Sequence, residues 1–349
     1  PRPPPPPLPA PPAPPPPYDA DADAVDGGDA DEPTATEPAA IETPPDENAT
    51  RIVETSFGTV ELPVEPQRVI ALDEYAAMNL LAVGIEPIET IGSYASLVSQ
   101  EILADRGVNV IEQPDAFTIN FEAIAAADPD VIVVTAESGF VSQVEPLQDI
   151  APTVVVPYTS PWREVIADTG ELFGRVDEAE RVTAGLEARL SDVASTIADA
   201  PYSLSILGET FDILFAVSQN AVLSAVVEEV GVTRPEAQLS GEPMAGFESI
   251  VNLSPELIAD HDADIVAVMS GVFYDETVVT DAPTYQSLDA VQRGSGVIVD
   301  GDMWFGTHPF AIYWILEDLG NLSAGLGAEG IGGLDDIDAR WAAYQDLIG

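Results

Sequence analysis

The chain has 349 residues and a formal net charge of −50, because 61 acidic residues face only 11 basic ones, all of them arginine. The electrostatic field of so many negative charges repels nucleic acids and anionic membrane surfaces, so we expect neither as a partner. The absence of cysteine excludes disulfides, thiolate metal sites and cysteine nucleophiles, and no apolar run reaches the length of about 18 residues that would span a membrane.

The lack of lysine together with the excess of carboxylates favours a surface adapted to high salt. At about 1 M salt the Debye length is about 3 Å, and crowded carboxylates no longer repel one another strongly. A genome rich in G and C could also replace lysine by arginine, so composition leaves both explanations open.

Residues 1–50 are mostly proline at first and then mainly Asp, Glu, Ala, Pro and Thr. Such a segment cannot bury enough apolar surface to offset the entropy of ordering, and proline-rich stretches stay extended. We interpret residues 1–50 as a disordered tether that holds a folded body away from a surface. The alternative is an upstream stretch that does not belong to the protein.

From residue 51 the sequence alternates short β-branched runs with amphipathic segments. The strands predicted in the first half are 68–72, 131–135 and 153–157, and the helices are 74–83, 121–127 and 141–149. Alternation of this kind predicts a parallel sheet with helices on both faces. We therefore assign residues 51–160 to an N-terminal α/β lobe.

Residues 161–199 break this rhythm, because they contain no strand pattern. Helices are predicted at 162–173 and at about 177–199, where apolar residues from Val182 to Ile197 keep a 3-4-3-4 spacing. At about 1.5 Å per residue, the second helix spans the width of a small domain. We expect this helical region to provide one long rigid helix between two lobes.

Residues 200–349 return to the alternating pattern and form the predicted C-terminal α/β lobe. Strands are expected at 202–207, at 265–270 and from Gly296 onward, and helices at 221–230 and 308–319. The predicted fold class is therefore α/β, with two Rossmann-like lobes built on central parallel sheets and joined by one long rigid helix.

The chain also matches itself without gaps at an offset of 134 residues. NFEAIAAADPDVIVV begins at Asn120, and SPELIADHDADIVAV begins at Ser254. Each copy predicts a capped short helix, a turn and a buried strand, with Glu122 or Glu256 in the first helical turn. Either glutamate alone would simply stabilise a helix N-terminus, but the duplication places one equivalent acidic tip on each lobe.

These elements resemble those of siderophore- and cobalamin-type substrate-binding proteins of ABC transporters. Residues 57–88 resemble the opening of that family, and residues 147–156 and both copies of the repeat resemble its later elements, so that the resemblance covers roughly 52–347. It implies an extracytoplasmic protein, at the cell surface or in the periplasm, that serves an ABC permease and ATPase complex and is anchored through an N-terminal segment absent from this chain. It also implies that Glu122 and Glu256 pair with arginines of the permease.

The ligand site is expected beyond the carboxyl ends of the strands, where open parallel sheets bind their ligands. Aromatic residues recur there in both halves and would line a shallow cleft for a bulky organic ligand, although any one of them could instead serve local packing. Trp162 and Trp304 are the preferred anchors. The other candidates are Tyr75, Tyr94, Phe211, Tyr274, Phe305, Arg163, Arg234 and His308.

Charge narrows the choice of ligand. Catecholate iron complexes are strongly anionic, whereas the only candidate cations of the cleft are Arg163 and Arg234, so a neutral or cationic ferric hydroxamate fits better. His261 and His308 have no partner at a ligand-like spacing. We therefore expect no protein-held metal and no cofactor, with iron arriving inside its chelator. Haem or cobalamin remains the alternative, with Tyr94 or His308 as axial ligand.

A two-lobed Rossmann-like enzyme is the alternative from another class. No G-x-G-x-x-G follows the first strand, and the chain has neither a Walker-type phosphate loop nor a G-x-S-x-G elbow. With two histidines and neither cysteine nor lysine, few groups are available for catalysis. We expect a monomeric binding protein for an iron chelate, not an enzyme; a surface adhesin is disfavoured by the repeat.

Overall fold

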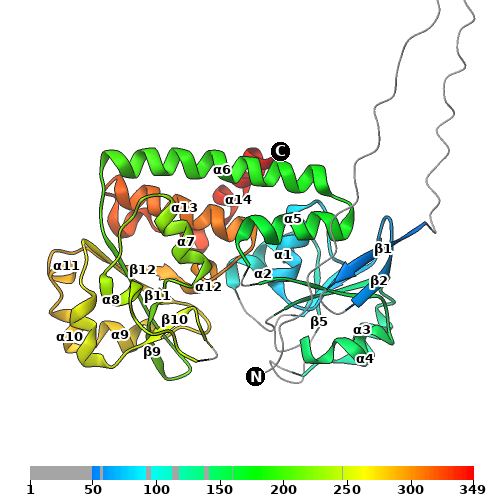
Figure 1. Ribbon diagram of the computed structural model, residues 1–349, viewed down its shortest axis with the longest axis horizontal. Helices are drawn as coiled ribbons and strands as arrows, with labels where there is room; N and C mark the ends of the chain where they lie inside the picture. The colour runs from blue at the N-terminus through cyan, green and yellow to red at the C-terminus, as the bar shows by residue number, and fades with distance from the viewer. Residues whose placement is uncertain are drawn as a thin grey trace, which may run out of the picture. The chain divides into compact units, whose positions relative to one another are not determined.

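Two five-stranded sheets and one long helix dominate the architecture (Figure 1). The computed structural model describes residues 49–55, 58–91, 96–111, 118–136, 141–158, 160–245 and 247–349. Apart from its last two residues, the predicted tether lies outside these ranges.

The first sheet has the order β5-β4-β3-β6-β7, and all its strands are parallel. Its strands are β3 (Val69–Ala71), β4 (Glu89–Ile91), β5 (Asn109–Ile111), β6 (Val131–Thr135) and β7 (Thr153–Val156). The crossover helices are α1 (Glu74–Ala82), α2 (Leu97–Asp105), α3 (Phe121–Ala126) and, after the short η1 (Val141–Gln143), α4 (Val144–Gln148). A separate hairpin of β1 (Thr50–Thr55) and β2 (Gly58–Pro63) precedes them. The three strands predicted in this half are present.

The second sheet has the order β10-β9-β8-β11-β12. Its strands are β8 (Leu204–Thr210), β9 (Ile213–Val217), β10 (Ile250–Asn252), β11 (Ile265–Ser270) and β12 (Gly296–Asp300). The predicted parallel arrangement holds for β8, β11 and β12, whereas β9 runs against both of its neighbours. The reversal occurs in a two-residue turn whose Phe211 and Asp212 have φ values of 50° and 63°, the left-handed geometry of tight hairpins.

The helices of this lobe are short, with one exception. They are α7 (Val222–Glu229), α8 (Glu236–Leu239), η2 (Pro255–His261), α9 (Glu276–Thr280), α10 (Pro283–Gln286), α11 (Asp289–Gln292), α12 (Gly301–Trp304), α13 (Pro309–Ser323), η3 (Gly327–Gly330), η4 (Leu334–Asp336) and α14 (Ile337–Ile348). The exception, α13, is buried along most of its length, which explains its almost continuous apolar sequence.

The predicted long helix is α6 (Val176–Asp199), which follows α5 (Trp162–Phe173) after a turn at Gly174 with φ 66°. The apolar stripe from Val182 to Ile197 is buried, and α6 packs against α5, α13 and α14. In Figure 1 it runs along one side of both sheets. One apolar core is continuous from the first lobe through α5, α6 and α13 into the second. Because close-packed interiors transmit strain, this core makes α6 a rigid connection, as predicted.

Candidate functional site

The candidate site begins at the carboxyl ends of β3 and β6. Asp73 caps α1 by accepting the amide of Ala76 at 2.8 Å, and it also accepts the amide and hydroxyl of Thr135 at 3.0 and 2.6 Å. Burial raises the pKa of Asp73. This carboxyl fastens two strand ends together and fixes the positions of Glu74 and Tyr75, which follow it.

The two lobes touch at this edge through side chains that we call the seam. Its members are Tyr75, Ser96 and Tyr158 of the first lobe and Met303, Phe305 and His308 of the second. The Tyr158 hydroxyl donates to the Phe305 carbonyl at 3.2 Å, and the Ser96 hydroxyl lies 3.6 Å from the Met303 sulfur. The Tyr75 ring packs edge-on against Tyr158, with centroids 4.9 Å apart, and lies 6.1 Å from His308.

More aromatic rings continue the seam into the second lobe. Tyr274 stacks on Phe305 at 6.0 Å, and Phe215 lies 6.3 Å from Tyr274 and 6.0 Å from Phe305. Gly301 permits this packing, because a Cβ there would come within 2.5 Å of the Tyr274 ring. The structure thus brings Tyr75, Tyr274, Phe305 and His308 together, as the strand-end rule predicted.

An aromatic pair, one ring exposed and the other half-buried, lies at the ends of β8 and β11. Phe211 is 69% exposed and its ring is 5.7 Å from that of Phe273. The two rings, with Val272 and Tyr274, line an open pocket of 410 Å³ that also includes Glu209 and Glu276. We call Phe211, Val272 and Phe273 the lip. The tight hairpin turn between β8 and β9 holds Phe211 at φ 50° and places its ring at this edge.

Two buried carboxyls flank the seam. Glu74 is 3% exposed; its Oε1 accepts the Ser96 amide at 2.9 Å, and its Oε2 has no partner in the described part of the chain. Burial, with smaller contributions from the charges of Asp302 and Asp73, raises the pKa of Glu74 to about 9. Asp302 is 7% exposed, and burial together with the charge of Asp300 raises its pKa to about 7.

His308 is a helix cap. Its Nδ1 accepts the Ala311 amide at 3.1 Å at the start of α13, and burial lowers the pKa of His308 to about 3. The side chain is therefore neutral at physiological pH. It belongs to the seam, but its Nδ1 is occupied by the helix.

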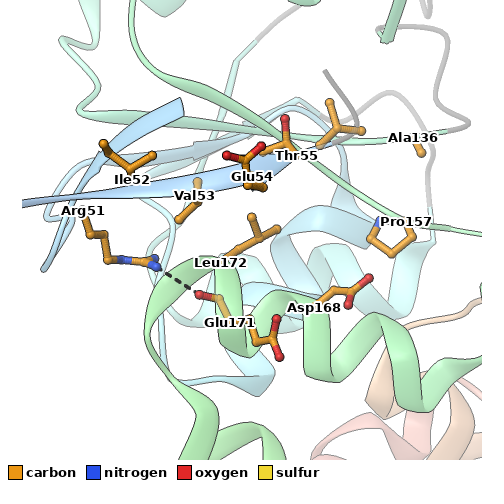
Figure 2. A pocket seen from close by; sticks show the side chains of 11 residues that line it. Arg51, Ile52, Val53, Glu54, Thr55, Ala136, Pro157, Asp168, Glu171 and Leu172 are labelled. Atoms are coloured by element: carbon orange, nitrogen blue, oxygen red, sulfur yellow. Dashed lines mark hydrogen bonds between the residues drawn. The ribbon is translucent and has the colours of Figure 1, made fainter. Parts of the chain in front are cut away.

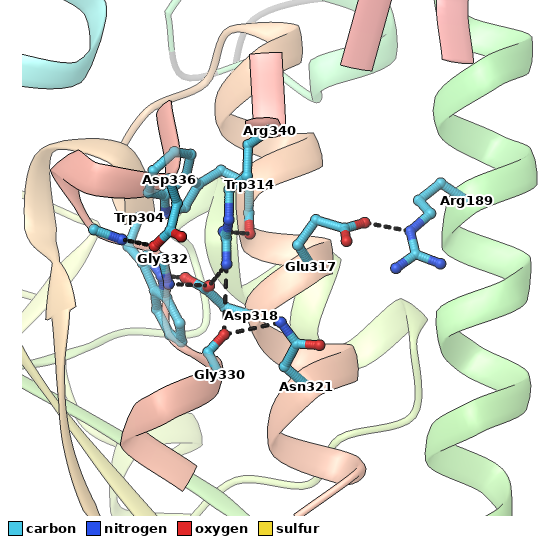
Figure 3. Close-up of polar contacts among 11 residues, drawn as sticks. Arg189, Trp304, Trp314, Glu317, Asp318, Asn321, Gly330, Gly332, Asp336 and Arg340 are labelled. Atoms are coloured by element: carbon cyan, nitrogen blue, oxygen red, sulfur yellow. Dashed lines mark hydrogen bonds and ion pairs between the residues drawn. The ribbon is translucent and has the colours of Figure 1, made fainter. Parts of the chain in front are cut away.

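The preferred anchors Trp304 and Trp162 are both buried, so neither presents its ring to the seam or the lip. Trp304 is 0% exposed, and its indole N–H donates to Asp318 at 2.8 Å (Figure 3). Trp162 is 2% exposed and lies beneath the guanidinium of Arg163, 4.1 Å from its ring centroid. Both indoles are core residues because the helices that carry them pack their apolar faces inward.

The two candidate cleft cations are also engaged elsewhere. Arg163 pairs with Glu187 of α6 at 2.9 Å and with Glu229 of α7 at 2.8 Å. Arg234 donates to the Val217 carbonyl at 2.5 Å and to the Gln238 side chain at 2.6 Å. Each arginine thus holds structural elements together, and the structure does not bring either of them into the seam or the lip.

Tyr94 lies outside the described residues. Ser96, Met303 and Asp302 were not among the predicted site residues, although all three follow predicted strand-exit segments closely. The signal that could have found Asp302 is its place two residues after the end of β12, at the edge where ligands bind.

A larger open pocket of 680 Å³ lies between the β1 hairpin and α5 (Figure 2). Arg51 borders it and donates to the Glu171 carbonyl at 3.0 Å, and Asp168 borders it on the same helix. Its described lining contains no aromatic ring. The seam and lip, in contrast, bring aromatic rings and carboxyls together.

The two acidic tips of the repeat are exposed. Asn120 caps α3 by accepting the Ala123 amide at 3.1 Å, as predicted, and Glu122 projects into solvent from the first turn. The second copy differs, because η2 is a 3₁₀ helix and the Ser254 side chain does not cap it. Hydrogen bonds from its own backbone amide and from Ser254 lower the pKa of Glu256, which is ionised and exposed.

In the described ranges, no helix is long and apolar enough to cross a bilayer. The same ranges contain no group of three or more His, Cys, Asp or Glu side chains arranged to hold a metal ion.

Known proteins with related sequences are binding proteins. The chain is 24% identical over 293 residues to the "probable siderophore-binding lipoprotein YfiY" of Bacillus subtilis, covering 77% of this chain and 86% of that protein. It is 24% identical over 295 residues to the iron(3+)-hydroxamate-binding protein YxeB of the same organism, covering 80% and 87%. The crystal structure of the petrobactin-binding protein YclQ from Bacillus subtilis shares the fold, with a TM-score of 0.66, 14% identity and coverage of 79% and 99%.

A sequence family also matches most of the folded body. Residues 69–302, which run from β3 in the first lobe to α12 in the second, match the family described as periplasmic binding protein. This match spans both sheets and the long helix. The chain therefore belongs to the periplasmic binding protein family.

Proposed function

We propose that this chain is the extracytoplasmic binding component of an ABC importer and that it captures a ferric siderophore of the hydroxamate type. The observation that carries the hydroxamate assignment is the composition of the seam and lip, which combine aromatic rings with buried carboxyls while both candidate arginines are engaged elsewhere. Anionic catecholate complexes would meet repulsion there, whereas a neutral or cationic chelate would not. The name of the relative YfiY supports a siderophore as ligand, and that of YxeB supports the hydroxamate type.

The proposed contacts are Tyr75, Tyr274, Phe305 and His308 at the seam and Phe211 at the lip. Rigid rings bind a bulky chelate at low entropy cost, and the tyrosine hydroxyls add hydrogen bonds. Iron is carried by the chelator, so that the protein needs neither a metal ligand nor a cofactor of its own.

Binding of matched chelates tests this function. Titration with a ferric hydroxamate, a ferric catecholate, haem and cobalamin, followed by calorimetry and intrinsic fluorescence, should give the tightest binding for the hydroxamate. Phe211→Ala should weaken that binding by about 1–3 kcal/mol, as for an aromatic anchor. Leu326→Ala, which changes another exposed apolar residue, beyond the C-terminal end of α13, serves as control. Binding of haem or cobalamin without hydroxamate binding would reassign the ligand.

Delivery to the membrane is proposed to use the acidic tips Glu122 and Glu256, which are exposed and available for bidentate pairs with permease arginines. We further propose that residues 1–50 act as a tether between a membrane anchor and the folded body. The body is proposed to divide into lobes 51–160 and 200–349 around the helical region 161–199. It is also proposed to act as a monomer. The lipoprotein name of YfiY supports an anchored, extracytoplasmic location.

The acidity is proposed to reflect adaptation to salt. Residues 51–349 hold 50 of the 61 acids and 10 of the 11 arginines, which leaves a net charge of −40 on the body. Self-repulsion should destabilise it at low ionic strength, so that raising salt from millimolar to molar raises the melting temperature. A melting temperature that does not rise with salt would favour genome composition as the reason for the missing lysine.

A further inference from the structure

Glu74 is a buried carboxyl whose second oxygen lacks a partner. Oε1 is held by the Ser96 amide at 2.9 Å, and Oε2 is buried with no donor in the described part of the chain. Buried polar groups are almost always hydrogen-bonded, and leaving one unpaired costs about 1–3 kcal/mol. An orphaned oxygen at a ligand edge therefore indicates a partner that arrives with the ligand.

A second carboxyl approaches the same place from the other lobe. Ser96, which holds Glu74, touches Met303 across the seam, and Met303 follows Asp302 in sequence. Among the described residues, Asp302 accepts one long hydrogen bond, from the Val272 amide at 3.3 Å. Its charge contributes to the raised pKa of Glu74, so the two groups interact electrostatically across the seam.

Aromatic rings surround this pair. Tyr75 follows Glu74 directly, and Tyr274 packs against Gly301, the neighbour of Asp302. Carboxyls within a wall of rings suit a cation, because the ring faces carry negative potential. The described residues contain no group of three carboxylates that could hold a metal ion. Arg163 and Arg234, which were predicted as cations of the cleft, are paired with other residues.

We propose that Glu74 and Asp302 receive a protonated amine carried by the chelate, which makes the preferred ligand a ferric hydroxamate with one free ammonium group. The proposal rests on the proposed function and names the ligand more closely. An ammonium group offers three N–H donors, enough to satisfy the orphaned Oε2 of Glu74 and an oxygen of Asp302 at once. A chelate without a charged group would bring no ammonium donor to either carboxyl.

The protonation of the two carboxyls agrees with this assignment. Burial, with smaller contributions from the charges of Asp302 and Asp73, raises the pKa of Glu74 to about 9, and burial with the charge of Asp300 raises that of Asp302 to about 7. Asp73, Asp300, Tyr75 and Tyr274, which pack around them, bring no positive charge. An incoming ammonium stabilises the carboxylate form. Binding of the amine-bearing chelate should therefore release about one proton near neutral pH.

Two chelates that differ by one charge test the proposal. A linear trihydroxamate ending in a primary amine and its N-acetylated form bind Fe³⁺ through the same oxygens, but only the first carries an ammonium. The unmodified protein should bind the ferric amine form about tenfold or more tightly, the range of a charge-assisted hydrogen bond. Glu74→Gln, which keeps the bond to Ser96, should remove most of this preference. In this variant, the binding enthalpy measured by calorimetry in buffers of different ionisation enthalpy should no longer show the release of a proton.

Glu65→Gln is the matched control, because Glu65 is exposed and precedes β3 at the opposite end of the strand. It removes the same charge from the overall field and should keep the full preference. Equal affinity of the unmodified protein for the two chelates would overturn the proposal, as would an unchanged preference in Glu74→Gln. If neither chelate binds, the proposed hydroxamate function itself is wrong and this inference falls with it. If Glu74→Gln lowers the melting temperature, Asp302→Asn serves as a second variant in which to measure the preference for the amine-bearing chelate.

Discussion

The two lobes share one building unit but use it differently. In each, a carboxylate just before a buried strand binds the start of the neighbouring strand: Asp130 accepts the amides of Gln67 and Arg68 at 2.7 and 3.0 Å, and Asp264 accepts the amide and hydroxyl of Ser203 at 2.8 Å. The helix before that carboxylate is a capped α-helix in the first copy and an uncapped 3₁₀ helix in the second. The clamp that sets strand register is the same in both lobes, whereas the helix geometry differs.

The lobes also differ in what stabilises them. The first is a uniform parallel sheet, and the second contains the reversed strand β9 and a buried polar network around Asp318 (Figure 3). Asp318 accepts from the Trp304 indole at 2.8 Å, the Gly332 amide at 2.9 Å and Arg340 at 2.7 Å. This network joins α12, α13 and α14 through a buried ion pair, whereas the buried Asp73 of the first lobe accepts only from backbone amides and a hydroxyl.

The largest expected effect concerns the two tips. Glu122→Ala combined with Glu256→Ala should nearly abolish transport or stimulation of the transporter ATPase, while ligand affinity and melting temperature stay unchanged, because rim charges act on docking rather than on folding. Each single change should give a partial defect, which would show that the α and 3₁₀ tips are equivalent. Glu65→Ala with Glu329→Ala, also exposed, is the control pair. Normal transport by the double variant would place the permease contact elsewhere.

Asp318→Asn should be the most destabilising single change. It leaves the guanidinium of Arg340, which is largely buried, without its anion, and the loss should be about 3–5 kcal/mol of unfolding free energy. Chemical denaturation measures it, with the exposed Asp335→Asn as control. A loss below about 1 kcal/mol would mean that the second lobe, like the first, is held mainly by apolar packing.

Glu74→Gln should stabilise the protein at alkaline pH. Because burial raises the pKa of Glu74 from 4.5 to about 9, the folded chain keeps a proton that the unfolded chain loses between these values, and unfolding free energy falls as pH rises through this window. Asp302 adds to this fall up to about pH 7. Glutamine imitates the protonated form, so the variant should gain about 1–3 kcal/mol at pH 8 and little at pH 4. Melting curves across pH 4–9 check this, and a parallel shift at all pH values would contradict it.

The smallest expected effect compares the two clamps. Asp130→Ala and Asp264→Ala each remove two hydrogen bonds at a strand start, and each should cost about 0.5–1.5 kcal/mol of unfolding free energy. Similar losses, measured by urea denaturation, would support a shared register device. If only one substitution is costly, the symmetry of the two copies is confined to the sequence.

Much of the fold could be predicted from local pattern. The strands at 131–135 and 265–270, the helix at 162–173 and the stripe along α6 all appear where periodicity predicted them, because a period of 2 or 3.6 reflects burial within one element. The Asn120 cap was also predictable, since a cap acts on amides only three residues away. The reversal of β9 was not predicted, because two left-handed residues that are not glycine give little signal in the sequence.

The site was predictable only as a region. The strand-end rule located Tyr75, Tyr274 and Phe305 correctly at one edge, because it follows from chain topology alone. Whether an aromatic ring or an arginine at that edge is free depends instead on partners far away in sequence. The Trp304 indole donates to Asp318, and Arg163 pairs with Glu229. The unpaired oxygen of Glu74 can be interpreted only together with Asp302 of the other lobe. Sequence therefore determined the elements and the edge, and tertiary packing decided which side chains remain available there, since burial and electrostatic pairing are set by contacts between elements.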